Sequence, residues 1–482
     1  MVAEGKPQQL GQQAQAAAAA REFAIWITLV NVALYATCYQ LQRPVEPFLI
    51  DQLTKTSQTN SLDEYAKLQS FFSALQMVGS VIVGWFLDRL GARTMFLVTF
   101  VASALSYYLL SQATTFDILY YSKLPTIFQA GFLCAQTLMA QITTNKTHRV
   151  VAMGRLTVAY SVGTVIGPAL GGFLGKKGDY YFGATLACYG SLLSCALSLL
   201  LPASSSYLAK ADLAESEAAD ADAAAAASAA AAASSEDASF SSSASSPSTS
   251  SMDKLRAVFL SVGGLLGTKV VSSVANSMRE TTQALVLKGT FSMREQQLGL
   301  TMSFLSGVNA LVNGFLLGPV SRYFGGDLLS VIYRCVAALS VLCLAQAALA
   351  PAASTVAGQG TPASLYCYLA TTFGMTICAY VLSTNATSES TSRVPASLRG
   401  TLLGVEHSLF AFARIGAPAA SVALLKAHGV AGVAGVAAAV FASILGAWHS
   451  SIGQAFGTAA LAGSGVGAIK EGRSMSEERK EK

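Results

Sequence analysis

Long apolar stretches, separated by short polar segments, decide what this chain can fold into. A helix that spans the roughly 30 Å hydrocarbon core of a bilayer needs about 20 mostly apolar residues. On that rule the sequence predicts about twelve spanning helices, about six on each side of a polar insert. They cover approximately residues 23–42, 66–87, 95–112, 116–142, 150–175, 180–201, 257–285, 297–321, 328–350, 363–385, 398–425 and 430–458.

Composition agrees with a chain that is solvated by lipid. Hydrophobic residues make up 52% of the chain and charged residues only 12%, which excludes an ordinary soluble domain. A β-barrel would show short alternating segments instead of long apolar runs. The predicted fold class is therefore an all-α membrane protein, with twelve transmembrane helices in two six-helix bundles.

The polar insert divides the chain into domains. It is rich in Ala and Ser and cannot bury enough apolar surface to offset its ordering entropy, so we expect disorder there. The expected organisation is a disordered cytoplasmic N-terminus (1–21), an N-terminal bundle (22–201), a disordered cytoplasmic linker (202–256), a C-terminal bundle (257–459) and a cytoplasmic tail (460–482).

Basic residues collect in alternate loops and predict the orientation. They follow the expected helices 2, 4, 8 and 10: Arg89, Arg93, Lys146, Arg149, Arg322, Arg393 and Arg399. The positive-inside rule makes these loops cytoplasmic, and with them both termini of the chain. The net charge of +5 thus reflects topology and does not imply nucleic acid. We expect a multi-pass monomer in the plasma membrane or an internal organelle membrane, with the bilayer and a small-molecule solute as partners.

No enzymatic, metal or ATP site is expected. The eight cysteines all fall within predicted spans and lack metal-ligand spacing, so we interpret them as packing residues. The sequence contains no Gly-x4-Gly-Lys-Ser/Thr motif for ATP and no arrangement of a nucleophile with a base. If the chain transports a solute, an ion gradient or the solute's own gradient must therefore drive it. No cofactor is expected, and H⁺ is the candidate coupling ion.

The stretch GWFLDRLGART ends the second apolar run with an acid and two arginines in one turn. Gly84 lets another helix approach, and Asp88 stands where a carboxylate can pair with an arginine or a helix N-terminus. Arg89 and Arg93 flank the turn at Gly91. A pair that is made in one conformation and broken in another would act as a gate. The alternative is a basic turn that only fixes topology.

A second pattern lies in MGRLTVAYSVGTVIGPALGG. Its members fit Gly-x8-Gly-x3-Gly-Pro-x2-Gly-Gly, namely Gly154, Gly163, Gly167, Pro168, Gly171 and Gly172. The proline bends the helix, and the glycines form a groove in which a neighbouring helix can slide. Tight packing of a glycine-rich membrane helix is the alternative interpretation.

These motifs resemble signatures of the major facilitator superfamily. The first is similar to the loop between helices 2 and 3, whose acid and arginines hold the cytoplasmic side closed against helix 11. The second is similar to the motif of drug/proton antiporters. The stretches AKLQSFFSALQMVGS, LTMSFLSGVNALVNG and LRGTLLGVEHSLFAFARIGAP are similar to organic-cation-transporter-like, tetracycline-transporter-like members of solute carrier family 22. The resemblance implies an organic cation or drug-like substrate.

Charged residues inside the predicted spans are candidates for substrate or proton coupling. A charge costs at least about 2.5 kcal/mol at the bilayer centre, so we expect such residues to face each other or a wet cavity. The candidates are Lys123, Lys269, Glu406, His407 and Arg414. A structural ion pair is the alternative for the deeper residues, and Lys123 could instead reach the interface.

Polar residues at helical spacing complete the candidate set. Asn31, Tyr35 and Gln76 belong to such stripes in the first two predicted spans. Stripes of this kind either bond neighbouring helices together or line a central cavity. The function predicted is secondary active transport of a small organic solute by alternating access, as proton-coupled antiport. The alternatives are an uncoupled facilitator of a polar metabolite and a transport-incompetent membrane sensor.

The two halves of the sequence predict unequal gates. GPVSRYFG, from Gly318, echoes GWFLDRLG but has Arg322 where the acid would stand. Replacing Asp88 with Asn should therefore reduce transport more than replacing Arg322 with Gln. Solute uptake by proteoliposomes containing each variant measures this, and equal losses would contradict a gate that depends on Asp88.

Overall fold

A computed structural model of the chain describes residues 5–57, 59–143, 146–176, 178–202, 251–312, 328–349, 361–393 and 399–449, together with Pro319 and Tyr323. Most of the expected linker, the loop that contains Arg322 and the residues after His449 lie outside this description. The side chains of Asp88 and His407 also lie outside it, although their backbones are helical.

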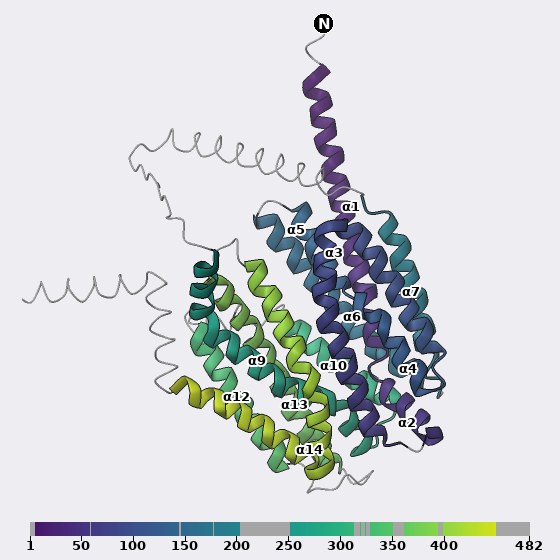
Figure 1. Cartoon of the computed structure of the whole chain (residues 1–482), viewed down its shortest axis with the longest axis vertical. Coiled ribbons are helices and arrows are strands. Elements are labelled where there is room, and N and C mark those ends of the chain that lie inside the picture. The colour runs from purple at the N-terminus through teal and green to yellow at the C-terminus, as the bar shows by residue number, and fades with distance from the viewer. Residues whose placement is uncertain are drawn as a thin grey trace, which may run out of the picture. The chain divides into compact units, whose positions relative to one another are not determined.

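The described residues fold into helices, without strands among them (Figure 1). The elements are α1 (Gly5–Leu41), α2 (Glu46–Ser57), α3 (Ser61–Ser111), α4 (Phe116–Lys123), the 3-10 helix η1 (Leu124–Phe128), α5 (Gly131–Ile142), α6 (Lys146–Gly175), α7 (Phe182–Leu199), α9 (Ser251–Gly289), α10 (Glu295–Leu311), α12 (Leu328–Leu349), α13 (Pro362–Ser392) and α14 (Arg399–His449). In this part of the chain, 8 helical segments are long and apolar enough to cross a membrane.

Two elements, α3 and α14, each contain two predicted helices that meet at a kinked glycine. Gly91 (φ 78°) interrupts α3, and Gly429 (φ 61°) interrupts α14. A positive φ is strained for residues with a side chain, because Cβ approaches the backbone carbonyl. The glycine of the predicted gate loop is therefore needed for its backbone conformation.

The helix predicted at 116–142 is wrong as a single span. It breaks into α4, η1 and α5, because Pro125 at the start of η1 lacks a backbone donor. Gly79 of α3 accommodates the break, since a Cβ there would lie 2.1 Å from the carbonyl oxygen of Ile127. The short helix α2 was also absent from the expected elements.

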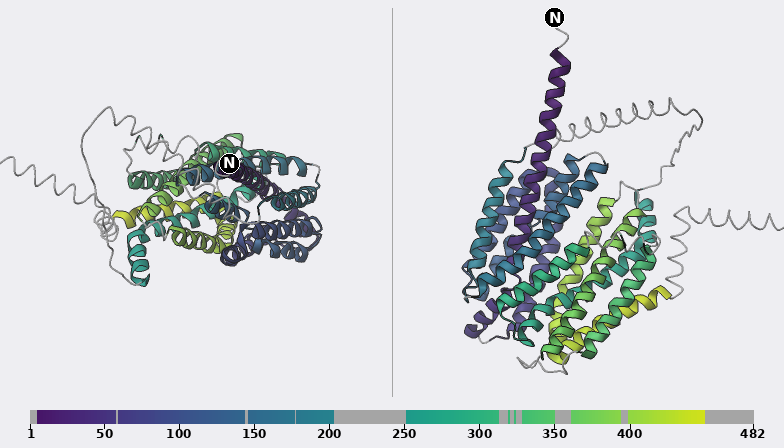
Figure 2. Two further views of the ribbon diagram at one scale, coloured as in Figure 1. Left: turned by 90° about the horizontal axis from the view of Figure 1, so that it is seen from above. Right: turned by 180° about the vertical axis from the view of Figure 1, so that it is seen from behind.

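Helical contacts divide the chain into two compact units that interleave in sequence. Unit 1 comprises residues 1–42, 78–170 and 181–248, and unit 2 comprises residues 43–77, 171–180 and 249–482. The start of α3 and the end of α6 thus belong with the C-terminal helices. Within unit 2, α9 packs along α14, and α12 packs along both α13 and α14 (Figure 2).

α1 is held tightly inside unit 1. It packs against α5 and α7, and most of its residues from Ala24 to Leu41 are buried or half-buried. α6 approaches it closely: a Cβ at Gly163 would lie 2.5 Å from the carbonyl oxygen of Ala33, and one at Gly167 would lie 2.7 Å from the Cβ of Gln40. Small residues allow such contacts where no hydrophobic drive operates between helices.

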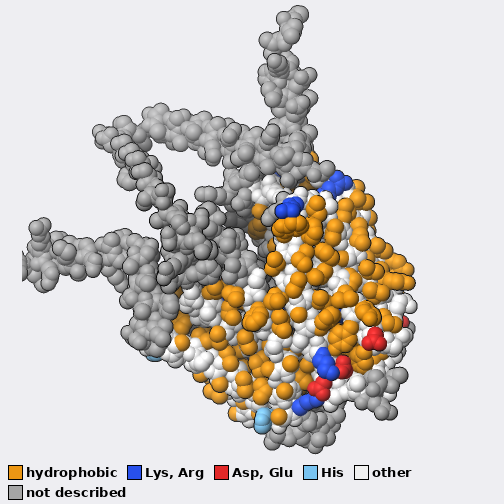
Figure 3. Space-filling view, in the orientation of Figure 1, with side chains coloured by type: hydrophobic (Ala, Val, Ile, Leu, Met, Phe, Trp, Pro, Cys, Tyr) orange, Lys and Arg blue, Asp and Glu red, His pale blue; other side chains and the backbone are white. Residues whose placement is uncertain are grey.

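The outer surface is apolar. On the face drawn in Figure 3, hydrophobic side chains cover most of the described surface, and charged side chains gather in small groups near its edges. Exposed residues on the helices include Trp26, Val81, Phe173, Phe304 and Phe412. Large apolar side chains in contact with the surroundings fit a protein whose solvent is lipid.

Gly163 and Gly154 offer a matched test of the α6 packing. Valine at Gly163 should lower the free energy of unfolding by about 1–3 kcal/mol, because its side chain would overlap α1. Valine at Gly154 should have a much smaller effect, since no heavy atom lies within 4 Å of the place that its Cβ would occupy. Thermal unfolding of the full chain in detergent measures both, and equal losses would refute the packing role.

Candidate functional site

A lysine and a glutamate form an ion pair in the interior of unit 2. Lys269 lies on α9 and Glu406 on α14, and their side chains are 2% and 6% exposed. The ammonium of Lys269 donates to Oε1 of Glu406 and to Oγ1 of Thr387 on α13, the latter at 2.6 Å. The structure thus brings together two of the residues that the sequence predicted, and adds a third.

One carboxylate oxygen in this cluster is left over. Oε2 of Glu406 is buried and has no hydrogen-bond partner among the described residues, whereas Oε1 takes the contacts from Lys269 and Thr387. The ring of Phe410 lies 5.7 Å from the ammonium of Lys269, on the same helix as Glu406. A buried polar atom without a partner is energetically costly, so the cluster leaves part of the hydrogen-bonding capacity of Glu406 unsatisfied.

Other predicted coupling residues do not join this pair. Arg414 lies two turns further along α14 and is exposed, and the side chain of His407 lies outside the described residues. Lys123 is half-buried in unit 1, where it ends α4 just before the break at η1. Lys123 therefore lies at the end of a short helix, whereas the apolar pattern predicted that it would lie inside a continuous spanning helix.

The polar stripe residues of unit 1 make contacts between helices. Asn31 on α1 is fully buried and donates from Nδ2 to Oγ of Ser198 on α7 at 3.1 Å. Tyr35, one turn on, donates its hydroxyl proton to the carbonyl oxygen of Gln129 at 3.1 Å. Gln76 is half-buried in unit 2. For Asn31 the interhelical bond agrees with the packing interpretation of the stripe.

The gate motif is built around the turn at Gly91. The guanidinium of Arg89 lies 3.8 Å from the ring centroid of Trp85, and Arg93 donates to the carbonyl oxygen of Leu199 at 2.8 Å. Arg93 therefore binds one of the carbonyls left open at the end of α7. Gly84 is half-buried with nothing within 4 Å of a Cβ position. The role of Asp88 stays a prediction.

The last part of the α6 motif contacts α10 in unit 2. Gly172 allows this approach, because a Cβ there would lie 2.4 Å from the carbonyl oxygen of Glu295. Pro168 and Gly171, which precede it in the motif, are buried. The motif thus packs on α1 with its central glycines and on α10 with its final one. Both interpretations of the motif expect this close packing, and its role in exchange stays a prediction.

Sequence reasoning missed a group of ion pairs in unit 2. Lys288 at the end of α9 pairs with Asp51 of α2, and it also donates to the carbonyl oxygen of Pro47 at 2.5 Å. Lys426 of α14 pairs with Asp63 at the start of α3 at 2.6 Å. We call these the α2–α3 pairs. They join segments separated by more than 200 residues, so a local pattern could not pair them.

Two further groups surround Lys288. Its ammonium lies 4.7 Å from the ring centroid of Phe48, and burial lowers its pKa although Asp51 opposes the shift. Tyr180, just after α6, donates to Oε1 of Glu295 at 2.8 Å. Burial and this bond raise the pKa of Tyr180 to about 12, so the phenol remains a donor at neutral pH. In the sequence, the residues of these ion pairs appear only as charges near helix ends. Such charges are as consistent with exposure to solvent as with ion pairing.

Charge reversal tests the Asp51–Lys288 pair. Asp51→Lys should destabilise the protein, and adding Lys288→Asp should restore part of the loss, with a coupling of about 0.5–1 kcal/mol because Asp51 is 42% exposed. Thermal unfolding of the single and double variants measures the coupling. Reversal of Glu64–Lys67, a pair within α3 whose lysine is exposed, is the control. A coupling no larger than that of the control would contradict a structural role.

Comparison with known proteins identifies the family of this chain. The family model described as Major Facilitator Superfamily matches residues 28–418. Solute carrier family 22 member 18 of Mus musculus is 25% identical over 421 residues, which cover 86% of this chain and 92% of the relative. The class H tetracycline resistance protein of Pasteurella multocida is 30% identical over 153 residues, covering 31% and 37%.

A solved structure shares the fold. The human organic anion transporter MFSD10 superposes with a TM-score of 0.55 at 18% identity, covering 88% of this chain and 98% of that protein. This similarity concerns the fold alone, and it confirms the predicted all-α membrane architecture. With the family model matching most of the chain, this protein belongs to the major facilitator superfamily, a family of transporters.

Proposed function

We propose that the chain moves a small organic solute across a membrane by alternating access, in exchange for protons. The observation that carries this proposal is the Lys269–Glu406 pair, buried in unit 2 with Oε2 of the carboxylate unpartnered among the described residues. Carboxylates in the interior of membrane proteins mark ion and proton pathways. The coupling ion is then H⁺, and the protein requires no other cofactor.

Protonation of Glu406 changes the balance of charge in the cluster. A proton on the carboxyl group removes the negative partner of Lys269, and an uncompensated buried charge is destabilising by about 3–5 kcal/mol. This destabilisation favours a rearrangement of the helices that hold the pair, because Lys269 can regain solvation only by moving. Since Lys269, Thr387 and Glu406 lie on α9, α13 and α14, a proton at one atom acts on three helices.

Alternating access also needs contacts that open and close at each end. The α2–α3 pairs support such a role at one end, because polar and ionic contacts can be exchanged for water with little net change in free energy. The GWFLDRLGART turn is the corresponding candidate at the cytoplasmic end, with Asp88 as its acid. In this scheme both termini are cytoplasmic.

The solute is drug-like in this proposal. The tetracycline and multidrug resistance proteins are among the relatives, and the sequence resemblance implies an organic cation or drug. The protein acts as a monomer in the plasma membrane or an organelle membrane. An uncoupled facilitator or a membrane sensor would need no titratable pair, which is the feature that separates these alternatives.

Replacing Glu406 with Gln tests the coupling. The variant should keep exchange of solute down its gradient but lose accumulation driven by a pH gradient, because Gln cannot bind or release the proton. The full chain is reconstituted in liposomes with a pH-sensitive dye inside, and a panel of organic cations, sugars and carboxylates is added in turn.

Glu389→Gln is the matched control, since Glu389 is a partly buried acid of α13 that pairs with Arg393 one turn away. Accumulation should survive in this control. If pH-driven accumulation were unchanged in Glu406→Gln, the proposed coupling through this pair would be wrong. If no solute moved protons in the wild-type protein, the facilitator and sensor alternatives would stand.

A further inference from the structure

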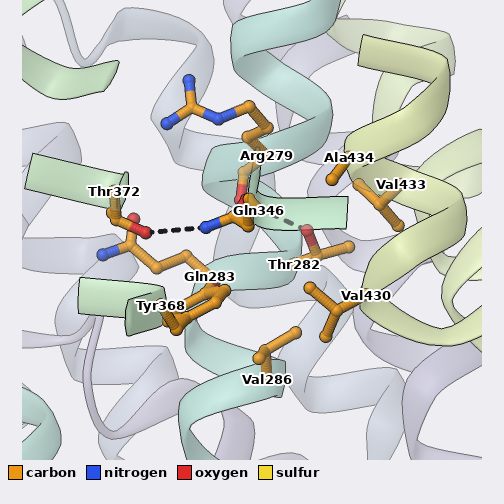
Figure 4. Close-up of a pocket in the computed structure, with 10 residues that line it drawn as sticks. All are labelled: Arg279, Thr282, Gln283, Val286, Gln346, Tyr368, Thr372, Val430, Val433 and Ala434. Atoms are coloured by element: carbon orange, nitrogen blue, oxygen red, sulfur yellow. Dashed lines mark hydrogen bonds between the residues drawn. The ribbon is translucent and has the colours of Figure 1, made fainter. Parts of the chain in front are cut away.

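A small cavity lies inside unit 2, among α9, α12, α13 and the part of α14 that follows Gly429 (Figure 4). Its space is about 320 Å³, including the part open to solvent. The cavity is separate from the Lys269–Glu406 pair, whose residues do not line it.

One wall is polar and carries a positive charge. Arg279, Gln283 and Val286 of α9 follow one another at spacings of four and three residues, so they share a helix face. In the view of Figure 4, the polar ends of Arg279, Gln283 and Thr372 lie on one side of the cavity, and Val430 and Val433 lie on the other. The sequence prediction did not select Arg279, because it falls near the end of an expected span.

Arg279 differs from two other cations on its helix. Lys269 pairs with Glu406 and Lys288 pairs with Asp51, whereas Arg279 donates to the neutral Oδ1 of Asn276 at 2.9 Å. Among the described residues, no aspartate or glutamate lines the cavity. A half-buried guanidinium with an amide partner has further donors in a fixed planar arrangement.

The neighbouring side chains disfavour a cationic ligand. Gln346 of α12 donates from Nε2 to the hydroxyl oxygens of Thr371 and Thr372, at 3.2 and 3.1 Å. These oxygens are therefore already accepting hydrogen bonds inside the protein. Arg279 would repel an ammonium group in this cavity, whereas it would donate hydrogen bonds to a carboxylate.

The opposite wall is apolar and suits a hydrocarbon or aromatic group. Val430, Val433 and Ala434, all of α14, line this side of the cavity. A ligand with an anionic end and a small apolar body would satisfy both walls at once, because the charge would meet the guanidinium while the body is removed from water.

We propose that this cavity binds the anionic group, a carboxylate or sulfonate, of a small amphiphilic solute through Arg279. That the bound molecule is the solute carried across the membrane rests on the proposed transport function. Arg279 and Glu406 would then place the solute and the proton on helices that pack along each other, α9 and α14. This assignment gives the solute a negative group, which the resemblance to organic-cation carriers does not predict.

Binding to the full chain in detergent tests the site without requiring transport. The probe is phenylacetate, with phenylacetamide and phenylethylammonium as neutral and cationic analogues of similar shape. Isothermal titration should show binding of phenylacetate to the wild-type protein, and much weaker binding of both analogues. Arg279→Gln should weaken phenylacetate binding about 10- to 100-fold, as expected for loss of a charge-assisted hydrogen bond. Arg279→Lys should retain part of the affinity.

Arg334→Gln, which removes an exposed arginine of α12, is the control for net charge and should bind phenylacetate like the wild type. Size-exclusion profiles establish that each variant is folded. The proposal is overturned if the wild type does not bind phenylacetate, if phenylethylammonium binds better, or if Arg279→Gln binds equally well.

Proteoliposomes separate this proposal from the proposed function. If organic cations drive proton flux that depends on Glu406 while phenylacetate neither binds nor moves protons, the anion site is wrong and the coupling stands. If phenylacetate binds through Arg279 but no solute moves protons, the site stands and the coupling is wrong.

Discussion

A charge placed among membrane helices has to find a partner, and this requirement organises the C-terminal helices. Lys269 and Glu406 meet across α9 and α14, with Thr387 of α13 completing the contact. Three helices are thereby held at one point. In the proposed mechanism, a proton on Glu406 removes one of the two charges, so this contact couples the packing of the helices to protonation.

The N-terminal helices meet a different constraint, which is close packing without a hydrophobic drive. Gly163 and Gly167 bring the backbone of α6 against α1. The same helix continues to Gly172, where its last turn contacts α10 within unit 2. One glycine motif thus serves two neighbours.

Charged groups near the helix ends behave differently from the buried pair. The carboxylates of the α2–α3 pairs are partly exposed, with Asp51 at 42% and Asp63 at 48%, so water can replace the lysine as their partner at little cost, although Lys288 itself is only 16% exposed. Contacts of this kind are suited to being made and broken. The local dielectric explains the contrast with Lys269–Glu406. The attraction between opposite charges is stronger in the buried pair than in the more exposed α2–α3 pairs, so the buried pair resists separation more while both groups are charged.

The sequence by itself determined most of the long apolar helices, the glycine at the α3 turn and the residue types that cannot be left alone in a bilayer. Length and apolarity suffice for these, because lipid requires every spanning backbone to satisfy its own hydrogen bonds. The break between α4 and α5 was missed, since it depends on Pro125 and on the space that Gly79 leaves for Ile127. Which residues each of these side chains contacts was decided only by the tertiary structure. Asn31 faces Ser198, Arg414 is exposed, and Arg279 lines a cavity, although all three lie in similar apolar runs. Periodicity assigns a side chain to a helix face, but which neighbour that face meets depends on how distant helices pack.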